Sequence, residues 1–487
     1  MTGLLTGNSW TGKIYNGQWV GSTGGTAEVS EPATGAMLAE VGLGNAADVE
    51  RASREASEAQ SAWAQRIGPE RAAILREAAK TLERHHEEVE RWLIRESGSV
   101  PGKAAFEVQL AQAELWEAAA LPTQPWGHLL PASQDGRHSA ARRLPLGVVG
   151  IISPWNFPFL LAIRAVAPAL ALGNAVVLKP DVQTAVVGGT AIAQLFHEAG
   201  LPEGLLQVLA GDAEPGQALC EDPNIAMVSF TGSTSIGREV ASAAGRNLKR
   251  VSLELGGNNA LIVLDDADVD TASSAGAWSA YLHQGQICMT AGRHIVVESV
   301  ADEYLDLLSR RAAALRVGDP NREEVALGPL INESQIANVE RVVNETVSSG
   351  AELRAGGKRD ALFYRPTVLG GVTAEMPAFR EEIFGPVAPV TVVRDEEEAI
   401  AVANDTDRGL VAAVQTSSAE RGNALANQLR TGIVHVNDQT LNNDAYAPFG
   451  GTGMSGNGSR FGSQSSWDEF TEWQWLTSRS QARQYPF

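Results

Sequence analysis

The chain contains only two cysteines in 487 residues, Cys220 and Cys288. Two cysteines cannot build a framework of disulfides, and no C-x-x-C or H-E-x-x-H motif of a zinc site occurs. This shortage predicts a protein that holds no metal and that works in a reducing compartment such as the cytoplasm.

Basic residues are also in short supply, with 38 Lys and Arg against 58 Asp and Glu and a net charge of −20. This balance argues against nucleic-acid partners and against adhesion to anionic membranes. The first residues lack the basic start and apolar run of a secretory signal. The longest apolar region, 157–172, is interrupted by Arg164 and Pro168, so no membrane span is expected.

Hydrophobic patterning predicts two α/β domains, because the chain is too long for one core. Helical periodicity runs through 45–95, with Pro69 at a helix start, and through 103–120. Short apolar runs then alternate with helical patterns, which is typical of a doubly wound parallel sheet. The first series of expected strands is 147–153, 174–179, 205–209, 225–230 and 249–255, with a helix expected over 184–199. The second is 260–264, 293–298, 388–393, 410–415 and 432–436.

Cys288 lies in the segment HQGQICMTAG (283–292), among small and polar residues. A structural cysteine usually lies in an apolar run, whereas this loop can expose the sulfur to a substrate. We therefore interpret Cys288 as a candidate nucleophile. Cys220 lies in a helical pattern and is interpreted as an ordinary structural cysteine.

Two polar residues follow expected strands and could assist a nucleophile. Glu254 ends a strand just before a Gly-Gly pair, where partial burial would raise its pKa and make it a general base. Asn156, in SPWNFP (153–158), carries an amide that can donate to a developing oxyanion. Each also fits a plain structural role, a salt bridge for Glu254 and a turn for Asn156.

A phosphate site is predicted where SFTGSTSIG (229–237) ends a strand and opens a helix. Gly232 and Gly237 would let the backbone approach the helix N-terminus, whose N–H groups attract phosphate. Lys179, at the end of another strand, could reach the ribose or phosphate of the same nucleotide. The segment is not the G-x-G-x-x-G fingerprint.

Seven motifs occur in one order: PWNFP (154–158), KP (179–180), FTGS (230–233), ELGG (254–257), GQIC (285–288), EEIFGPV (381–387) and PFGG (448–451). Their order resembles the NAD(P)-dependent aldehyde dehydrogenase superfamily over essentially the whole chain. LHQGQICMTAGRH (282–294) and GIVHVND (432–438) look like the benzaldehyde dehydrogenase group of aromatic aldehyde dehydrogenases.

The resemblance implies a covalent mechanism. The Cys288 thiolate would attack the aldehyde carbon to give a thiohemiacetal, with the oxyanion held by Asn156 and the backbone N–H of Cys288. Hydride would leave for the nicotinamide, and Glu254 would activate the water that hydrolyses the remaining thioester.

The resemblance also implies NAD or NADP as the cofactor. Glu382 is expected to hold the nicotinamide ribose with Phe384 beside it, and Lys179 to contact the adenosine ribose. Many members that prefer NAD carry a glutamate three residues after this lysine, where the chain has Val182, so the preference stays open; the adjacent Asp181 could substitute. The other expected cofactor contacts are Trp155, Gly232, Ser233 and Gly237.

The implied substrate tunnel is apolar and suits the flat ring of benzaldehyde or a substituted benzaldehyde. A medium-chain aliphatic aldehyde would fit almost as well, and vanillin and salicylaldehyde are near alternatives. Arg164 could give the tunnel a polar wall. A cysteine acyltransferase or hydrolase without nicotinamide is the alternative from a different enzyme class. The expected tunnel residues are Phe157, Leu160, Leu161, Ile287, Met289 and Phe449.

We therefore predict the aldehyde dehydrogenase fold, α/β with three parts. A doubly wound, Rossmann-like NAD(P)-binding domain would comprise 1–126 and 146–255, and a second α/β catalytic domain 256–453. Residues 127–145 and 454–487 would form a β-arm and tail for oligomerisation, because their β-like stretches fit neither sheet and an open edge invites another chain. A homodimer or homotetramer is expected.

Overall fold

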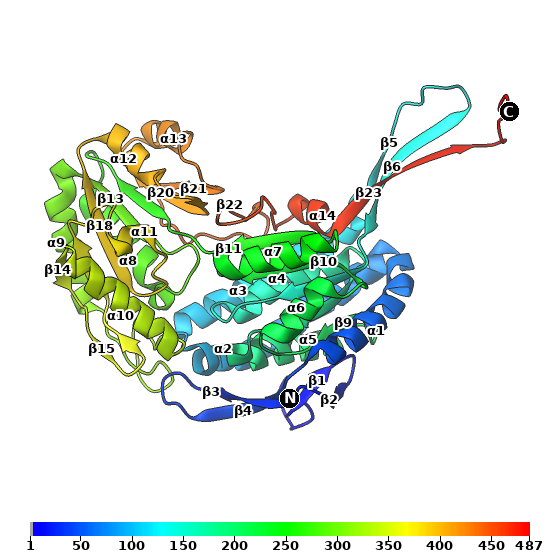
Figure 1. Cartoon of the computed structure of the whole chain (residues 1–487), viewed down its shortest axis with the longest axis horizontal. Coiled ribbons are helices and arrows are strands. Elements are labelled where there is room, and N and C mark those ends of the chain that lie inside the picture. Colours follow the sequence, from blue (N-terminus) through cyan, green and yellow to red (C-terminus); the bar gives the residue numbers. More distant parts are fainter. Residues whose placement is uncertain (1–2) are drawn as a thin grey trace.

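The computed structural model describes residues 3–487, which form two seven-stranded sheets, a projecting three-stranded arm and smaller hairpins (Figure 1). The first sheet has the order β11-β10-β7-β8-β9-β1-β2. Its strands from β11 to β9 are parallel, and their near-complete burial explains why they read as continuous apolar runs. These strands are β7 (Val148–Ile152), β8 (Ala175–Lys179), β9 (Leu206–Val208), β10 (Ile225–Gly232) and β11 (Arg250–Leu255).

Helices cover both faces of this sheet, as expected for a doubly wound fold. The periodic region 45–95 divides into α1 and α2, and Pro69 lies in the first turn of α2 as predicted. Pro158 likewise begins α4, which is almost wholly buried. The helices are α1 (Ala46–Gln65), α2 (Gly68–Ser97), α3 (Pro101–Ala120), α4 (Pro158–Ala171), α5 (Ala191–Glu198), α6 (Ala213–Glu221) and α7 (Thr234–Arg246).

The helix expected over 184–199 is wrong at its start. Val182–Thr184 is a 3₁₀ turn and Val186–Thr190 is a π-helical turn, so the α-helix begins only at Ala191. The buried carboxylate of Glu96 accepts the backbone N–H groups of Val186 and Val187, at 2.8 and 2.7 Å. Glu96, a side chain of α2, thus accepts backbone N–H groups at the start of this segment. This contact joins residues far apart in the chain, so the local sequence does not reveal it.

The N-terminal strands extend the first sheet and were not expected from the pattern. β1 (Lys13–Tyr15) pairs antiparallel with both β9 and β2 (Trp19–Gly21). A separate hairpin joins β3 (Thr26–Ser30) to β4 (Met37–Gly42). Strands of three residues are too short for an alternation of apolar and polar residues to be recognised.

The second sheet has the order β14-β17-β18-β13-β12-β20-β21, and all its pairs but β14–β17 are parallel. The five expected strands are present as β12 (Ala260–Val263), β13 (Arg293–Val297), β18 (Val387–Val393), β20 (Val411–Gln415) and β21 (Ile433–Val436). β14 (Glu352–Ala355) and β17 (Thr367–Gly370) were not expected.

The helices around the second sheet are α8 (Val269–Tyr281), α9 (Glu298–Ala314), α10 (Glu333–Ser348), α11 (Pro377–Arg380), α12 (Glu396–Ala403) and α13 (Ala419–Ala426). Small pairs join β15 (Arg359–Asp360) to β16 (Phe363–Tyr364) and β19 (Arg408–Gly409) to β22 (Thr452–Gly453).

The arm projects from the body and is built from two segments far apart in the sequence (Figure 1). β6 (Arg137–Pro145) pairs antiparallel along its whole length with β23 (Thr471–Arg479), which follows α14 (Gln464–Phe470), and its other edge pairs with β5 (Gly127–Leu129). Trp473 and Trp475 are exposed on it. No helix among residues 3–487 has the length and apolar character to cross a membrane.

Candidate active site

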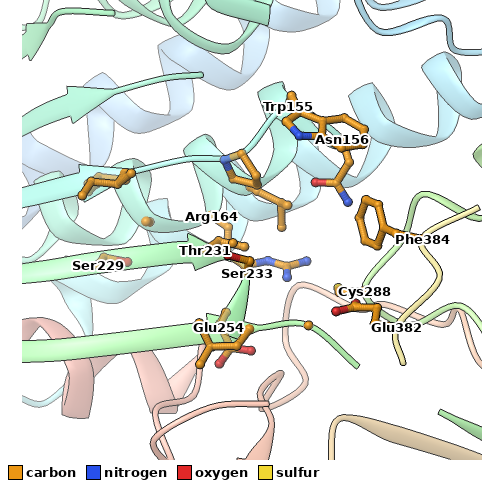
Figure 2. A pocket seen from close by; sticks show the side chains of 18 of the residues that line it. Trp155, Asn156, Arg164, Ser229, Thr231, Ser233, Glu254, Cys288, Glu382 and Phe384 are labelled. Atoms are coloured by element: carbon orange, nitrogen blue, oxygen red, sulfur yellow. The ribbon is translucent and has the colours of Figure 1, made fainter. Parts of the chain in front are cut away.

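The predicted catalytic residues come together in one cavity beside the ends of β10 and β11 (Figure 2). Their cavity encloses about 1180 Å³ of space that is partly open to solvent. The labelled side chains reach it from the loop after β7, from α4, from β10 and the residue that follows it, from β11, and from the loops that precede β13 and β18. Trp155, Asn156, Gly232, Ser233, Glu254, Cys288, Glu382 and Phe384 all line it.

Cys288 lies in a turn with unusual backbone geometry. His283 and Gln284 adopt positive φ angles of 49° and 57°, and Gly285 follows at 68°. Asn259 anchors the turn, because its Nδ2 donates to the carbonyl of Cys288 at 2.8 Å. The thiol is partly exposed to the cavity but deeply set, and burial raises its pKa to about 12, with a further contribution from the carboxylates of Glu382 and Glu254. The thiol of the ligand-free site is therefore protonated at neutral pH.

Asn156 points its amide into the cavity that contains Cys288 (Figure 2). The side chain is 5% exposed, and Nδ2 donates to the carbonyl of Gln286 at 2.9 Å. Asn156 is thereby tied to the turn that carries the cysteine, two residues before it. This arrangement suits an amide that shares an oxyanion with a backbone N–H.

Glu254 ends β11 with its carboxylate buried and 6% exposed. Neither oxygen makes a hydrogen bond of normal geometry, and burial raises the pKa of Glu254 well above the usual value, while Arg164, Arg460 and the backbone N–H of Gly451 oppose the shift. A carboxylate with a raised pKa and free acceptor atoms inside a cleft has the properties of a general base.

Glu382 is held by two groups that sequence reasoning missed. Its carboxylate accepts the N–H of Gly257 at 2.9 Å and pairs with Arg408 at 2.6 Å. A side chain on Gly256 would collide with it, since a Cβ there would lie 1.8 Å from Oε2. The Gly-Gly pair therefore makes room for Glu382, whereas no local motif marks Arg408.

The predicted cofactor residues lie along a groove of about 1750 Å³ that continues from the cavity. Lys179, Asp181, Val182, Gly232 and Ser233 all line it, and the side chain of Ser233 caps the N-terminus of α7. A helix N-terminus in a groove of this size fits a dinucleotide pyrophosphate. Burial lowers the pKa of Lys179, while Asp181 and Asp212 raise it.

Two other predicted cofactor residues have different surroundings. Gly237 lies outside the groove, on the buried side of α7, where a Cβ would lie 2.4 Å from the side chain of Leu255. The glycine at position 237 is explained by the close packing of α7 against β11, and not by the approach of a nucleotide to the backbone there. Phe384 lies edge-on to Trp155, with ring centroids 5.5 Å apart, and its φ of 53° places it on a strained turn.

All six predicted tunnel residues line a second cavity of about 420 Å³ that also reaches Cys288. Phe106, Leu110 and Leu441 add to the apolar wall and were not predicted. Two polar groups interrupt this wall. The carbonyl oxygen of Asn443 is buried without a partner, and so is one terminal nitrogen of Arg164.

Arg164 is nearly buried and lines both cavities. Its Nε donates to Glu114 at 3.0 Å, and its guanidinium lies 4.4 Å above the ring of Phe449. The ion pair with Glu114 holds the Arg164 guanidinium in the wall of the cavity. The wall is therefore partly polar, which the sequence left open. No cluster of three or more His, Cys, Asp or Glu residues within 3–487 is arranged to hold a metal ion.

Comparison with known proteins agrees with this geometry. A family model described as "Aldehyde dehydrogenase family" matches residues 19–476. A vanillin dehydrogenase from an Amycolatopsis species is 52% identical over 99% of this chain and 100% of its own length. A benzaldehyde dehydrogenase [NAD(+)] from Pseudomonas putida is 48% identical over 98% of both chains.

Solved structures are similar over their whole length. An aldehyde dehydrogenase from Brucella melitensis biovar abortus superposes with a TM-score of 0.94 at 35% identity, covering 99% of this chain and 100% of its own. A betaine aldehyde dehydrogenase from Staphylococcus aureus in complex with NAD+ superposes with a TM-score of 0.95 at 29% identity, covering 98% and 97%.

Proposed function

The chain belongs to the aldehyde dehydrogenase family, and from that premise we propose that it oxidises an aromatic aldehyde to its carboxylic acid with NAD or NADP. The observation that carries the proposal is the convergence of Cys288, Asn156 and Glu254 on one cavity that opens into an apolar pocket. Family membership favours this reaction over the acyltransferase or hydrolase without nicotinamide.

The first step in this mechanism is the loss of the Cys288 proton. Glu254 is the acceptor suggested by its unpaired, buried carboxylate. The thiolate then forms a bond to the aldehyde carbon, and the carbonyl π electrons move to oxygen. Asn156 Nδ2 and the N–H of Cys288 donate to that oxyanion, in a position shielded from water, where such donors are most effective.

The cofactor groove suits a dinucleotide, and Lys179, Ser233 and Glu382 are the residues proposed to hold it. A bound nicotinamide would supply the hydride acceptor for the thiohemiacetal carbon, and loss of that hydride would leave a thioester on Cys288. Glu254 releases the proton of Cys288 to solvent and then takes a proton from water. The hydroxide attacks the thioester carbon, and the C–S bond breaks to release the carboxylic acid and leave Cys288 as a thiolate.

A ring that carries oxygen substituents, as in vanillin, is the second candidate substrate. The partnerless oxygen of Asn443 and nitrogen of Arg164 favour it, because a buried polar group without a partner costs free energy that a ring hydroxyl would recover. An aliphatic chain would leave both groups unpaired. The names of the relatives from Amycolatopsis and Pseudomonas putida support both aromatic candidates.

One kinetic panel tests the proposal. Benzaldehyde, vanillin, salicylaldehyde and hexanal are each offered with NAD and with NADP, and kcat/KM is measured from the reduced cofactor. We expect the aromatic aldehydes to exceed hexanal by at least about tenfold, or roughly 1.4 kcal/mol, because a rigid ring loses less conformational freedom on binding than a flexible chain. Turnover of hexanal alone would contradict the aromatic assignment.

Two further proposals concern the oligomeric state of the protein and its cellular compartment. We propose a homodimer or homotetramer joined through the arm, because the exposed Trp473 and Trp475 and the open edge of β23 would be covered by a second copy. The cytoplasm is proposed because both cysteines are free.

A further inference from the structure

The peptide of Asn156 is held from behind by a buried ion pair on α3. Lys103 Nζ donates to the Asn156 carbonyl at 2.9 Å and to the Glu107 carboxylate at 2.5 Å. Both charged side chains have no exposed surface. Burying two charges is costly unless each gains several strong contacts, so the contacts of this pair indicate what it holds in place.

Glu107 occupies the start of α4. Its Oε1 accepts the N–H groups of Phe159 and Leu160, at 2.9 and 3.1 Å. Pro158, the first residue of the helix, has no N–H to satisfy. The carboxylate therefore pairs the free donors of the first turn and lies at the positive end of the helix dipole.

Lys103 donates to the Asn156 carbonyl, which has no hydrogen-bond partner within α4. In a regular continuation of α4 the Asn156 carbonyl would accept the N–H of Leu160, but that N–H is directed to Glu107. The Lys103 ammonium donates to this carbonyl instead and lies 4.0 Å above the ring of Phe157. Lys103 thus holds the carbonyl of the peptide group between Asn156 and Phe157.

A second helix start shows what the lysine adds. Glu96 is also buried and accepts the N–H groups of Val186 and Val187, but no Lys or Arg within the described residues pairs with it. A buried carboxylate alone is therefore enough to cap a helical segment in this fold. The ammonium of Lys103 is an addition that appears where the capped helix begins beside the active site.

We propose that Lys103 and Glu107 are positioning residues for oxyanion stabilisation. Neither lines the substrate cavity, so they act through Asn156, whose amide they hold ready to meet the oxyanion. Donors that are already in place pay no reorganisation cost in the transition state, and a displacement of about 1 Å typically costs about a hundredfold in rate. The inference rests on the proposed role of Asn156.

The first test separates the hydrogen bond from the buried charge. Glu107→Gln keeps an acceptor for the first turn of α4, and Lys103→Met in that background removes the donor to Asn156 without leaving a buried charge unpaired. Single-turnover hydride transfer from benzaldehyde is followed at saturating NAD+. The double variant is expected to be about tenfold to a hundredfold slower than wild type, with the Kd for NAD+ unchanged. Equal rates would overturn the proposal.

The second test asks whether the effect passes through Asn156. In an Asn156→Ala background, removing Lys103 is expected to change the rate less than about twofold, because the amide that it positions is gone. Glu96→Gln is the matched control, since it alters an equivalent capping carboxylate. The fold-changes in the rate of hydride transfer caused by Glu96→Gln and by Asn156→Ala should multiply in the double variant.

The outcomes distinguish this inference from the proposed function. If Asn156→Ala does not slow hydride transfer, the proposed oxyanion role is wrong and the inference falls with it. If Asn156→Ala slows transfer and the Lys103 effect multiplies with it, as for Glu96→Gln, then Lys103 is merely structural and only the inference is overturned.

Discussion

Replacing Glu254 with glutamine should separate the two halves of the reaction. The carboxylate is buried, lacks hydrogen-bond partners and has a raised pKa, all of which favour a base for water. Loss of a general base typically slows its step by about 10²–10⁴-fold. We therefore expect thioester hydrolysis in Glu254→Gln to slow by that factor.

Acylation should respond in the opposite direction. The negative charge of Glu254 helps to raise the pKa of Cys288, so its removal lowers the thiol pKa, and each unit of fall multiplies the thiolate population about tenfold. The loss of Glu254 as the proton acceptor is thereby offset. The first turnover should produce a burst of reduced cofactor followed by a stall.

Stopped-flow absorbance of the reduced cofactor measures both phases in one experiment. The wild-type hydrolysis rate should rise with pH through the raised pKa of Glu254, because the base acts in its charged form, and this rise should be absent from Glu254→Gln. Disappearance of the burst along with steady turnover would refute the predicted offset, since Glu254 would then be indispensable as the proton acceptor for Cys288 as well as for water.

Three further results are expected. Val182→Glu should reduce the use of NADP relative to NAD by about 1–3 kcal/mol in kcat/KM, because it adds a negative charge where Val182 neither attracts nor repels a 2′-phosphate; a wild-type enzyme already a thousandfold better with NAD would contradict this. Burial raises the pKa of Glu96 to about 8 in the folded state, so its contribution to stability is full below the unfolded pKa and is lost as pH rises through 8. Thermal melts should show this loss in wild type and not in Glu96→Gln, and parallel curves would exclude it. Truncation after Asp468 should yield monomers or insoluble protein by light scattering, and an intact enzyme that runs as a 51.5 kDa monomer at micromolar concentration would overturn the proposed role of the arm.

Most parallel strands of the two sheets could be predicted from sequence, because burial on both faces leaves short apolar runs between helical patterns. β8 is such a strand, with all five residues buried. β17, whose four residues are also buried, is the exception. The antiparallel edge strands β2 and β14 escaped prediction for the same physical reason in reverse. β14 is mostly exposed and carries Glu352 and Arg354, so it has no apolar run to recognise.

The residues of the candidate site likewise fall into those that the sequence identifies and those that it does not. Cys288, Glu254 and Asn156 stand in motifs with glycine or proline neighbours, so their loops could be identified from sequence. Arg408 and Lys103 could not be found, because their importance comes from long-range contacts that no local pattern records. Lys103 and Glu107 have the spacing of an exposed helical ion pair, and only the packing of α3 against α4 shows that they are buried.

The domain limits at 126, 146, 256 and 453 stay predictions. The two sheets change over between β11, which ends at Leu255, and β12, which begins at Ala260, so the predicted limit after 255 falls in the connecting loop. β1 and β2 belong to the first sheet, which agrees with placing the N-terminal region beside 146–255.

The central claim is a thioester on Cys288, and mass spectrometry of the stalled enzyme tests it most directly. Glu254→Gln is mixed with benzaldehyde and NAD+, quenched in acid and digested. The peptide that contains Cys288 should carry the mass of one benzoyl group, and the same peptide from a Glu254→Gln/Cys288→Ala variant should not. An unmodified Cys288 peptide after a full burst of reduced cofactor, or a benzoyl group on another residue, would contradict the account.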